Sequence, residues 1–588
     1  MFVYQVEESH IMPVKRILLF IIAWILAQVG LAEPAPINGN AMTSPDQWYF
    51  YVTEDGGLWL AYYTTDGPVR KLRLRRPDGV EFVVGPPRRE QAPSGLALLA
   101  GPDGPRLAWR DKFTRKSLYF QASPDSTPLS IAGDTEPLTR LHLAETDGRI
   151  HILWYGEKFD EPLNERYFLY HRSVKPNGSD PSKIQRLMPA IYPLWIVDGE
   201  DIAVFSERWR PDGKTDVVGV QTLNPESGEF NDPVQVTTHR FGPTHKAFAS
   251  GGRWFLVWVG LNEEDSFVLQ AAFSDDKGKT WKHAAFDGLL GMDMARIDAA
   301  VDERGRIVLA VSGKYPRQPL MGKETVYLIR SDDNGDSWSD PIAVRSDGLE
   351  GFRGRLPSVA FGSKPGELIM VWEDWRMIRG VIYASLSQDF GKTWTIREVP
   401  LTMPTANYGL PFWTKAVRAY KDGYVLMFER YRDDGMRTKD LFELRLGAKD
   451  LERIAAQRTS QAEHENLTQE RLKQRADAFW QAFEAENYRT VYSMLDPYYR
   501  ANQSEESFVK MMGAVKYYSH KFDDVRLEGR LGGLKTTVNS AVPEIMIDGN
   551  LVSKEPRDHQ FWDLWVFVNG DWHRQFYREV SDKRWTRY

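Results

Sequence analysis

One eight-residue stretch decides the fold of this chain: Ser274-Asp275-Asp276-Lys277-Gly278-Lys279-Thr280-Trp281. The same pattern, S-x-D-x-G-x-[ST]-W, recurs at 331–338 as SDDNGDSW and at 387–394 as SQDFGKTW. The copies start 57 and 56 residues apart. A fixed period of this length indicates a repeat architecture.

The residue types explain what each copy does. Short Ser and Asp side chains bond to nearby backbone N–H groups and hold a tight turn. The glycine allows a positive φ, and the tryptophan begins the next apolar strand. We therefore predict a β-hairpin with a side-chain-stapled turn in each repeat, formed by Ser274, Asp276, Gly278, Trp281, Ser331, Asp333, Gly335, Trp338, Ser387, Asp389, Gly391 and Trp394.

The pattern resembles the Asp-box of the sialidase-like β-propellers, the bacterial neuraminidase repeat family. In that family the box is a structural turn, so the resemblance implies a fold and leaves the activity open. Short β runs bounded by turn residues recur through 46–447, which argues for sheets over helices. We count about eight units, with seven as the alternative. The last unit lacks a fourth strand, which an N-terminal segment would supply.

Composition limits the classes of partner. The 588 residues carry a formal net charge of -6 and no basic stripe, which argues against nucleic acid. The 20 Trp, 25 Tyr and 29 Phe suit a β-rich protein with large aromatic cores. The chain has no Cys, so disulfides do not support its fold.

The N-terminal residues have the layout of an export signal. Lys15 and Arg16 precede an apolar run over 17–31, and small residues favour cleavage after Ala32. We predict a signal peptide over 1–32, with Met12 as an alternative start, and an N-terminal segment over 33–45. An uncleaved anchor is the alternative, but the run is shorter than the roughly 20 residues that a span requires. The expected location is periplasmic or secreted, in a bacterium, with no membrane span after cleavage.

After residue 447 the pattern changes. A charged, Ala-rich stretch predicts a helical linker over 448–466. Leu472, Ala476, Phe479 and Phe483 then mark one face of an amphipathic helix. Helices followed by hairpins over 467–588 indicate an α+β domain. This order, with a terminal W-x-F-x-x-G-x-W hairpin, resembles the cone-shaped nuclear transport factor 2-like fold, whose pocket Asp563, His573 and Tyr577 would face.

Candidate site residues follow the second strand of several units. An acid, an aromatic residue and an arginine recur there, at the end of each unit opposite the Asp-box. The pattern predicts a mouth lined by Glu207, Arg208, Glu373, Arg376, Glu429 and Arg430. The alternative is that these residues stabilise the fold. In that case Arg stacks on Trp and pairs with Glu in each unit, and the pattern recurs because the structural unit recurs.

The sialidase resemblance implies roles for particular residues. Three arginines would hold a substrate carboxylate, drawn from Arg353 or Arg355, Arg376 and Arg430. Tyr408 would be the nucleophile, Glu373 or Glu429 its base, and Asp293 the acid. The chain departs from the family because its R-x-P segment comes late, its units exceed six, and no Tyr carries a distinctive motif.

Two functions remain open at this point. The first is a carbohydrate-active protein, an exo-glycosidase acting on acidic sugars. The second is a non-catalytic scaffold of the cell envelope that binds a glycan or a protein. We expect neither a cofactor nor a metal. An enzyme requires the candidate residues to converge in one pocket, whereas a scaffold would pair them with one another.

Overall fold

A computed structural model describes the chain over the following residues: 36–37, 48–66, 69–84, 93–111, 117–133, 135–157, 161, 166–190, 193–210, 217–238, 245–261, 267–290, 296–313, 325–345, 354–374, 380–402, 412–431, 439–456, 466–496, 499–500, 503–512, 515–528, 531–541, 546–547, 550–551, 555–568 and 570–575. The predicted signal peptide lies outside this part of the chain.

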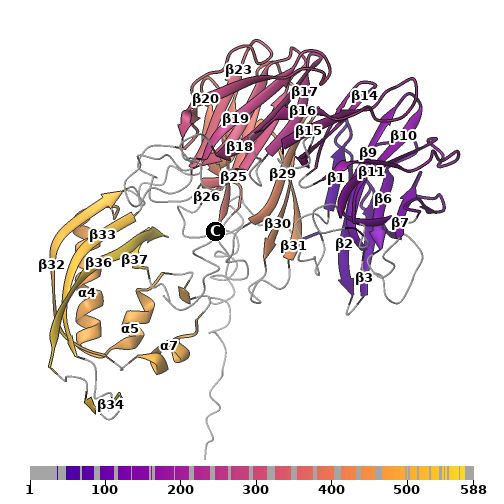
Figure 1. Ribbon diagram of the computed structural model, residues 1–588. Coiled ribbons are helices and arrows are strands. Elements are labelled where there is room, and N and C mark those ends of the chain that lie inside the picture. Colours follow the sequence, from indigo (N-terminus) through magenta and orange to yellow (C-terminus); the bar gives the residue numbers. More distant parts are fainter. Residues whose placement is uncertain are drawn as a thin grey trace, which may run out of the picture.

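Successive strands form antiparallel sheets in sequence order (Figure 1). The first two sheets contain β1 (Trp48–Val52), β2 (Leu58–Asp66), β3 (Val69–Arg75) and β4 (Glu81–Val84), then β5 (Pro93–Leu99), β6 (Arg106–Asp111), β7 (Ser117–Gln121) and β8 (Leu129–Ser130). The next two contain β9 (Glu136–Thr146), β10 (Arg149–Glu157), β11 (Tyr167–Val174) and β12 (Gln185–Pro189), then β13 (Leu194–Asp198), β14 (Asp201–Trp209), β15 (Val217–Thr222) and β16 (Val234–Thr237).

The remaining sheets of this series continue the same order. They contain β17 (His245–Ser250), β18 (Arg253–Leu261), β19 (Phe267–Ser274) and β20 (Lys282–Leu290), then β21 (Arg296–Val301), β22 (Ile307–Gly313), β23 (Thr325–Ser331) and β24 (Ile342–Ala343). The last two contain β25 (Gly354–Phe361), β26 (Leu368–Asp374), β27 (Val381–Ser387) and β28 (Ile396–Pro400), then the three strands β29 (Phe412–Tyr420), β30 (Gly423–Tyr431) and β31 (Lys439–Leu446).

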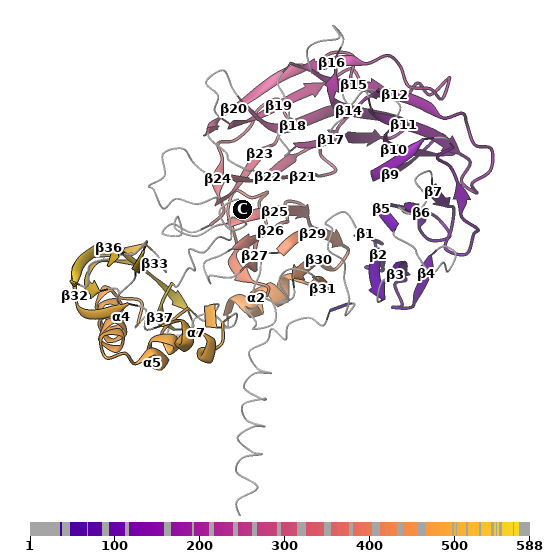
Figure 2. The ribbon, with the colours of Figure 1, turned by 60° about the horizontal axis from the view of Figure 1, so that its bottom comes forward.

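The sheets stand side by side around a common centre, in the manner of propeller blades (Figure 2). A buried apolar cluster joins each sheet to the next one along the chain. A further cluster joins β30 and β31 to β2, so the last sheet packs on the first. Alternating apolar residues on both faces of each sheet therefore produce a closed series of sheet-to-sheet cores.

An N-terminal segment extends the three-stranded sheet. Pro36 forms an antiparallel bridge with Phe442 on β31, and the Ile37 N–H donates to the Leu441 carbonyl at 2.8 Å. Ile37 also packs on the cluster between β31 and β2. The segment that precedes β1 thus pairs with the outer strand of the last sheet.

Each Asp-box has the predicted stapled turn. In the first copy the Gly278 N–H donates to Ser274 Oγ at 2.8 Å, and the Thr280 N–H donates to Asp276 Oδ1 at 2.8 Å. The copies at 331–338 and 387–394 have the same bonds at 2.7–2.9 Å. Both residues at the bend have positive φ, for example 57° at Lys277 and 86° at Gly278.

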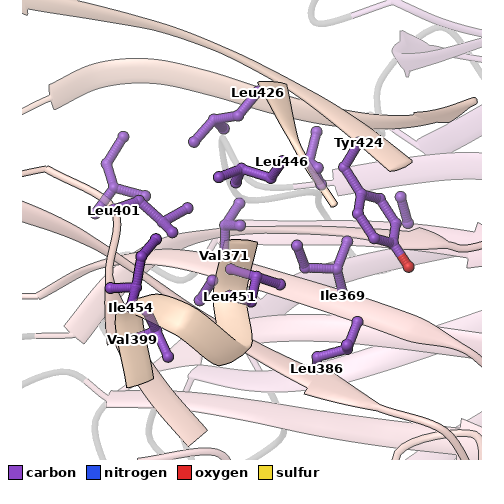
Figure 3. Close-up of a cluster of buried hydrophobic side chains, with 14 of the residues drawn as sticks. Ile369, Val371, Leu386, Val399, Leu401, Tyr424, Leu426, Leu446, Leu451 and Ile454 are labelled. Carbon is purple, nitrogen blue, oxygen red and sulfur yellow. The ribbon is translucent and has the colours of Figure 1, made fainter. Parts of the chain in front are cut away.

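The stretch expected as a helical linker packs on the sheets instead of standing apart from them. Helix α2 (Ala448–Ala456) buries Leu451 and Ile454 in the core that β25–β28 share with β29–β31 (Figure 3). Val399, Leu426 and Leu446 belong to the same core. The two apolar residues lie three positions apart on one helix face, which the charged composition of the stretch concealed.

The C-terminal elements form a separate layer of helices against a curved sheet (Figure 1). The helices are α4 (Gln469–Glu484), α5 (Tyr488–Ser493) and α7 (Glu505–Met511). The sheet has the order β32-β33-β36-β37, formed by β32 (Lys516–Glu528), β33 (Leu531–Ala541), β36 (Arg557–Val568) and β37 (Asp571–Arg574), beside a hairpin of β34 (Met546–Ile547) and β35 (Asn550–Leu551).

The predicted apolar face of α4 is confirmed, because Leu472, Ala476, Phe479 and Phe483 are all buried. Helix α7 begins after its N-cap Ser504, whose Oγ accepts from the Ser507 N–H. The first strand of this sheet, β32, begins at Lys516, where Lys516 and Tyr517 pair with Ala541 and Ser540 of β33.

Candidate functional site

The end of β26 carries two buried acids. Glu373 and Asp374 are the last residues of the strand, and both are 0% exposed. Arg355 on β25 lies directly opposite Glu373 in the strand register. Its Nε and Nη2 both donate to Glu373 Oε1 at 3.3 Å. The two opposite charges thus form a cross-strand pair.

Asp374 has partners of its own. The indole N–H of Trp372 donates to Asp374 Oδ2 at 3.0 Å, and the same oxygen forms an ion pair with Arg345 Nε at 2.9 Å. Arg345 reaches this position past Gly354, where an added Cβ would lie 2.7 Å from Arg345 Cδ. The glycine therefore leaves the space through which the arginine approaches the carboxylate.

The neighbouring sheet repeats this arrangement at the end of β30. Lys439 Nζ donates to Glu429 Oε2 at 3.2 Å, and both residues are buried. Arg430 follows Glu429 and lies opposite Asp440 in the register of β31. Burial lowers the pKa of Arg430 to about 9, which leaves its guanidinium charged at neutral pH.

These eight residues, four cations and four acids, form what we call the charged rim: Arg345, Arg355, Glu373, Asp374, Glu429, Arg430, Lys439 and Asp440. The side chains of its three measured ion pairs are 0–12% exposed. Seven members of the rim belong to two adjacent sheets that share one apolar core, and Arg345 comes from beyond β24 on the preceding sheet.

The inner strands beside the rim are held together by a second carboxylate. Asp298 on β21 accepts from Lys246 Nζ of β17 at 2.9 Å and from Ser358 Oγ of β25 at 2.9 Å. Ser358 Oγ in turn accepts from the Val417 N–H of β29 at 3.3 Å. Burial alone would raise the pKa of Asp298, but Lys246 and Arg418 lower it below its usual range. Four successive inner strands are thus connected through one anion.

Charges at the Asp-box end of the sheets are arranged differently. Arg253 donates to Asp275 in one box and to Asp336 in the next, and Lys277 pairs with Asp201 of the preceding sheet at 2.6 Å. The Lys277 and Asp336 side chains are 60% and 67% exposed. Exposed pairs of this kind contribute little to stability, and they fasten neighbouring turns without burying charge.

The structure describes some of the candidate residues and not others. Arg355 and Glu373 contact each other, and Glu429 and Arg430 lie in sequence on β30. Glu207 is half-buried on β14, and Arg208 belongs to the same strand. The positions of Arg353, Arg376, Tyr408 and Asp293 lie outside the described residues, as does that of Tyr577.

Sequence reasoning missed four members of the charged rim, namely Arg345, Asp374, Lys439 and Asp440. Lys439 and Asp440 open β31 and stand opposite the end of β30. Arg345 comes from beyond β24 on the preceding sheet. One signal for Lys439 was available in the sequence. Glu429 lies near the end of β30, and Lys439 is the first residue of β31, the strand that pairs with β30.

Two further properties concern the described part of the chain. Among these residues, no three His, Asp or Glu side chains are grouped so that they could hold a metal ion. None of the described helices combines the length and the apolar character that crossing a membrane requires.

No protein-family profile matches the chain, and no curated protein matches its sequence. Solved structures similar to it include a leech intramolecular trans-sialidase complexed with 2,7-anhydro-Neu5Ac, at 12% identity and a TM-score of 0.32, covering 71% of this chain and 92% of that one. A polysaccharide lyase of family PL25, an ulvan lyase, is 13% identical with a TM-score of 0.36 and coverages of 72% and 98%. The WD40 domain of SCAP from fission yeast is 11% identical with a TM-score of 0.40 and coverages of 71% and 98%. Because these TM-scores are below 0.5, none of them bears on the activity of this chain.

Proposed function

We propose that the charged rim is the ligand-binding edge of a carbohydrate-active propeller and that its ligand is an acidic sugar. The observation that carries the proposal is the burial of charge at this edge. Three ion pairs with side chains at most 12% exposed lie at the ends of β26 and β30 on adjacent sheets, one of them formed with Arg345 from beyond β24. Burying an ion pair commonly stabilises a protein less than apolar residues of the same size would. Such a set is therefore better explained by a role in recognition than by stability.

The sequence around the rim supports an anionic ligand. The four cations and four acids of the rim balance in charge. The chain continues from these strand ends into Arg353 and Arg376, two cations with no acid directly beside them, and into Arg432, which Asp433 and Asp434 follow. The planar guanidinium binds a carboxylate through two parallel hydrogen bonds, so an arginine-rich edge suits a sugar acid.

The catalytic form of this proposal is an exo-glycosidase. Glu373 or Glu429 would then serve as the base for a Tyr408 nucleophile, with Asp293 as the acid. Arg355, Arg353, Arg376 and Arg430 would hold the sugar carboxylate. In this arrangement the cation beside each glutamate, Arg355 or Lys439, would keep the carboxylate oriented.

A non-catalytic glycan-binding scaffold is the second candidate, and one observation favours it. Both described glutamates already accept hydrogen bonds from a cation on the paired strand. This is the internal pairing expected of a scaffold. The two candidates share the edge and the ligand class, and they differ only in turnover.

The experiment is an assay of the mature chain from Glu33 against fluorogenic α-sialosides and uronides, with binding to the same unlabelled sugars measured by calorimetry. Glu373→Gln, Glu429→Gln and Arg355→Met are the test variants. Lys277→Met, at the Asp-box end, is the matched control. Turnover lost in the glutamine variants and kept in the control supports the glycosidase. Binding without turnover, lost in Arg355→Met, supports the scaffold. Neither turnover nor binding to any acidic sugar contradicts both.

The wider organisation is proposed on the same basis. We infer that the eight sheets over 48–446 are eight blades of one propeller, closed by the 36–37 segment. The helices and sheet after 467 have the element order of a nuclear transport factor 2-like domain. The export layout of 1–32 makes the protein periplasmic or secreted. Cleavage after Ala32 in the exported chain, detected by N-terminal sequencing, tests the last point.

A further inference from the structure

Strand β25 contains an irregularity directly beside the charged rim. It pairs with β26 as far as Arg355 and again from Ser358 onward. Between these two points β25 has Leu356 and Pro357, whereas β26 has the single residue Trp372. An extra residue on one strand of an antiparallel pair is a β-bulge. We call Leu356 and Pro357 the rim bulge.

The backbone of Leu356 is strained. Its φ is 52°, in the left-handed region that leucine rarely adopts. A residue before a proline favours extended backbone, so Pro357 opposes this conformation further. Lys277 has a similar φ of 57°, but it lies in the stapled turn of an Asp-box and not within a strand. Strain of this kind persists where the surrounding structure enforces it, commonly at a functional site.

The rim bulge decides on which face of the sheet Arg355 lies. Residues that stand opposite each other in an antiparallel pair share one face. If the pairing continued regularly from Ser358, Leu356 would stand opposite Glu373. Arg355 would then stand opposite Asp374, on the other face, because a shift of one residue moves a side chain across the sheet. The bulge therefore brings Arg355 to Glu373.

The two faces of β26 are directed at different sheets. Val371 belongs to the core shared with β29–β31, so Glu373, two residues further on, faces that sheet (Figure 3). Met370 and Trp372 belong to the core shared with β21–β24, so Asp374 faces the preceding sheet. The choice of face for an arginine opposite these acids is thus a choice between two neighbouring sheets.

The distribution of charge shows what the bulge achieves. Asp374 already pairs with Arg345 at 2.9 Å. In the regular register Arg355 would join Arg345 at the same carboxylate, and a leucine would lie against the fully buried Glu373. Burying a carboxylate beside an apolar side chain is costly. With the bulge, each of the two acids has one arginine, on opposite faces of the sheet.

We propose that the rim bulge is a positioning element of the ligand site, which acts by holding Arg355 on the face directed at β29–β31. Arg430 follows Leu426 and Phe428 of the same core at alternate positions of β30, so it is directed at this space too. Two guanidiniums are thereby offered to one sugar carboxylate. The identity of the ligand rests on the proposed function, whereas the face on which Arg355 lies does not.

The first test replaces Leu356 by residues that differ in their tolerance of a positive φ. Glycine adopts this conformation freely and asparagine tolerates it, whereas it is strongly unfavourable for valine and isoleucine. We expect Leu356→Gly and Leu356→Asn to bind the acidic sugar as the wild type does. Leu356→Val and Leu356→Ile should bind it about tenfold more weakly, or weaker still, because Arg355 is displaced. If Leu356 only filled space, the order would be reversed, since valine and isoleucine are apolar and closer to leucine in size.

Lys277→Val is the matched control, because it imposes the same backbone strain at the Asp-box end. It should lower the unfolding temperature and leave sugar binding unchanged. Thermal unfolding of every variant shows that it is folded before its affinity is interpreted.

Disulfide trapping reads the register without any ligand, because the chain has no cysteine of its own. Cysteines that stand opposite each other on paired strands are close enough to be bridged. Arg355→Cys/Glu373→Cys therefore reports the bulged register, and Arg355→Cys/Asp374→Cys reports the regular one. We expect the first pair to oxidise when position 356 is leucine or glycine, and the second pair to oxidise when it is valine.

Oxidation of the second pair with leucine at position 356 would overturn the proposal. So would sugar binding at the wild-type affinity by folded Leu356→Val, or lost binding in folded Leu356→Gly. If the wild type binds no acidic sugar, the proposed function fails, and trapping alone decides the inference. A valine at position 356 that moves the disulfide from Glu373→Cys to Asp374→Cys then supports the role of the bulge, and an unmoved disulfide refutes it.

Discussion

The buried pair of Lys439 and Glu429 allows the argument about the charged rim to be tested quantitatively. Their side chains are 0% and 4% exposed, and Nζ and Oε2 lie 3.2 Å apart. Removing one member of such a pair leaves the other charge buried, which costs about 3–5 kcal/mol. We therefore expect Lys439→Met and Glu429→Leu each to destabilise the protein by about this amount.

The double variant should behave differently from either single one. Methionine and leucine have nearly the volumes of the residues they replace and carry no charge to desolvate. Replacing a whole buried pair by apolar residues is often neutral, or stabilising by about 1–4 kcal/mol. Lys439→Met/Glu429→Leu should therefore recover most of the stability lost by the single variants. The exposed pair of Lys277 and Asp201 is the control, and Lys277→Met should change stability by less than about 1 kcal/mol.

The assay is thermal unfolding of all variants at one scan rate, followed by binding of whichever acidic sugar the panel of sialosides and uronides shows to bind the wild type. A chain of this size need not unfold in two states, so the ranking of the variants carries the conclusion. A double variant no more stable than the weaker single one would refute the view that desolvation dominates this pair. A double variant that is stable and binds the sugar as tightly as the wild type does would show that Lys439 and Glu429 do not contribute to ligand binding.

Three other predictions concern the fold. Gly335→Ala should lower the unfolding temperature more than Gly79→Ala. Both glycines have φ near 85°, which costs alanine about 1–2 kcal/mol, but only at Gly335 would the new Cβ clash, because it would lie 2.5 Å from a phenylalanine ring, at a further cost of about 1–3 kcal/mol. Equal shifts of the unfolding temperature would contradict this prediction. Burial lowers the pKa of His171 to about 3 and that of His151 to about 4, so the unfolded chain binds more protons than the folded chain below pH 6.5. The free energy of unfolding should therefore fall as the pH drops from 6.5 towards 4, and it should fall less in His171→Gln. Thermal melts across that pH range measure both. Ile37→Asp should lower the unfolding temperature by placing a charge in the core between β31 and β2, and an unchanged melt would show that the segment is dispensable.

The sequence was informative wherever the structural cause was local. The Asp-box could be read because its serine, aspartate and glycine bond within the same eight residues. The apolar face of α4 could be read because it repeats along one helix. In both cases the spacing of residue types is itself the cause of the structure.

The candidate site was predicted less completely because its pairs join separate strands. Glu373, Glu429 and Arg355 were named as candidates, but the pairing of Arg355 with Glu373 was not predicted, and Lys439, the partner of Glu429, was missed. Arg345 reaches Asp374 from the preceding sheet, and a glycine, not a charged residue, makes room for it. Helix α2 shows the same limit, since its charged composition suggested a linker and only packing reveals Leu451 in the core.

The ion pairs at the two ends of the sheets differ in exposure, and the proposed place of the ligand rests on this difference. Asp374 on β26 pairs with Val381, the first residue of β27, and the Asp-box begins at Ser387, its last, so about seven extended residues, roughly 20 Å, separate the rim from the Asp-box. At the Asp-box end, Lys277 is exposed and its pair with Asp201 contributes little to stability, whereas Arg106 and Glu367 are buried there. At the rim, charges are withdrawn from water, which opposes folding unless they are paired. The Asp-boxes, which reveal the fold, therefore lie at the end of the sheets opposite the one where we expect the ligand to bind.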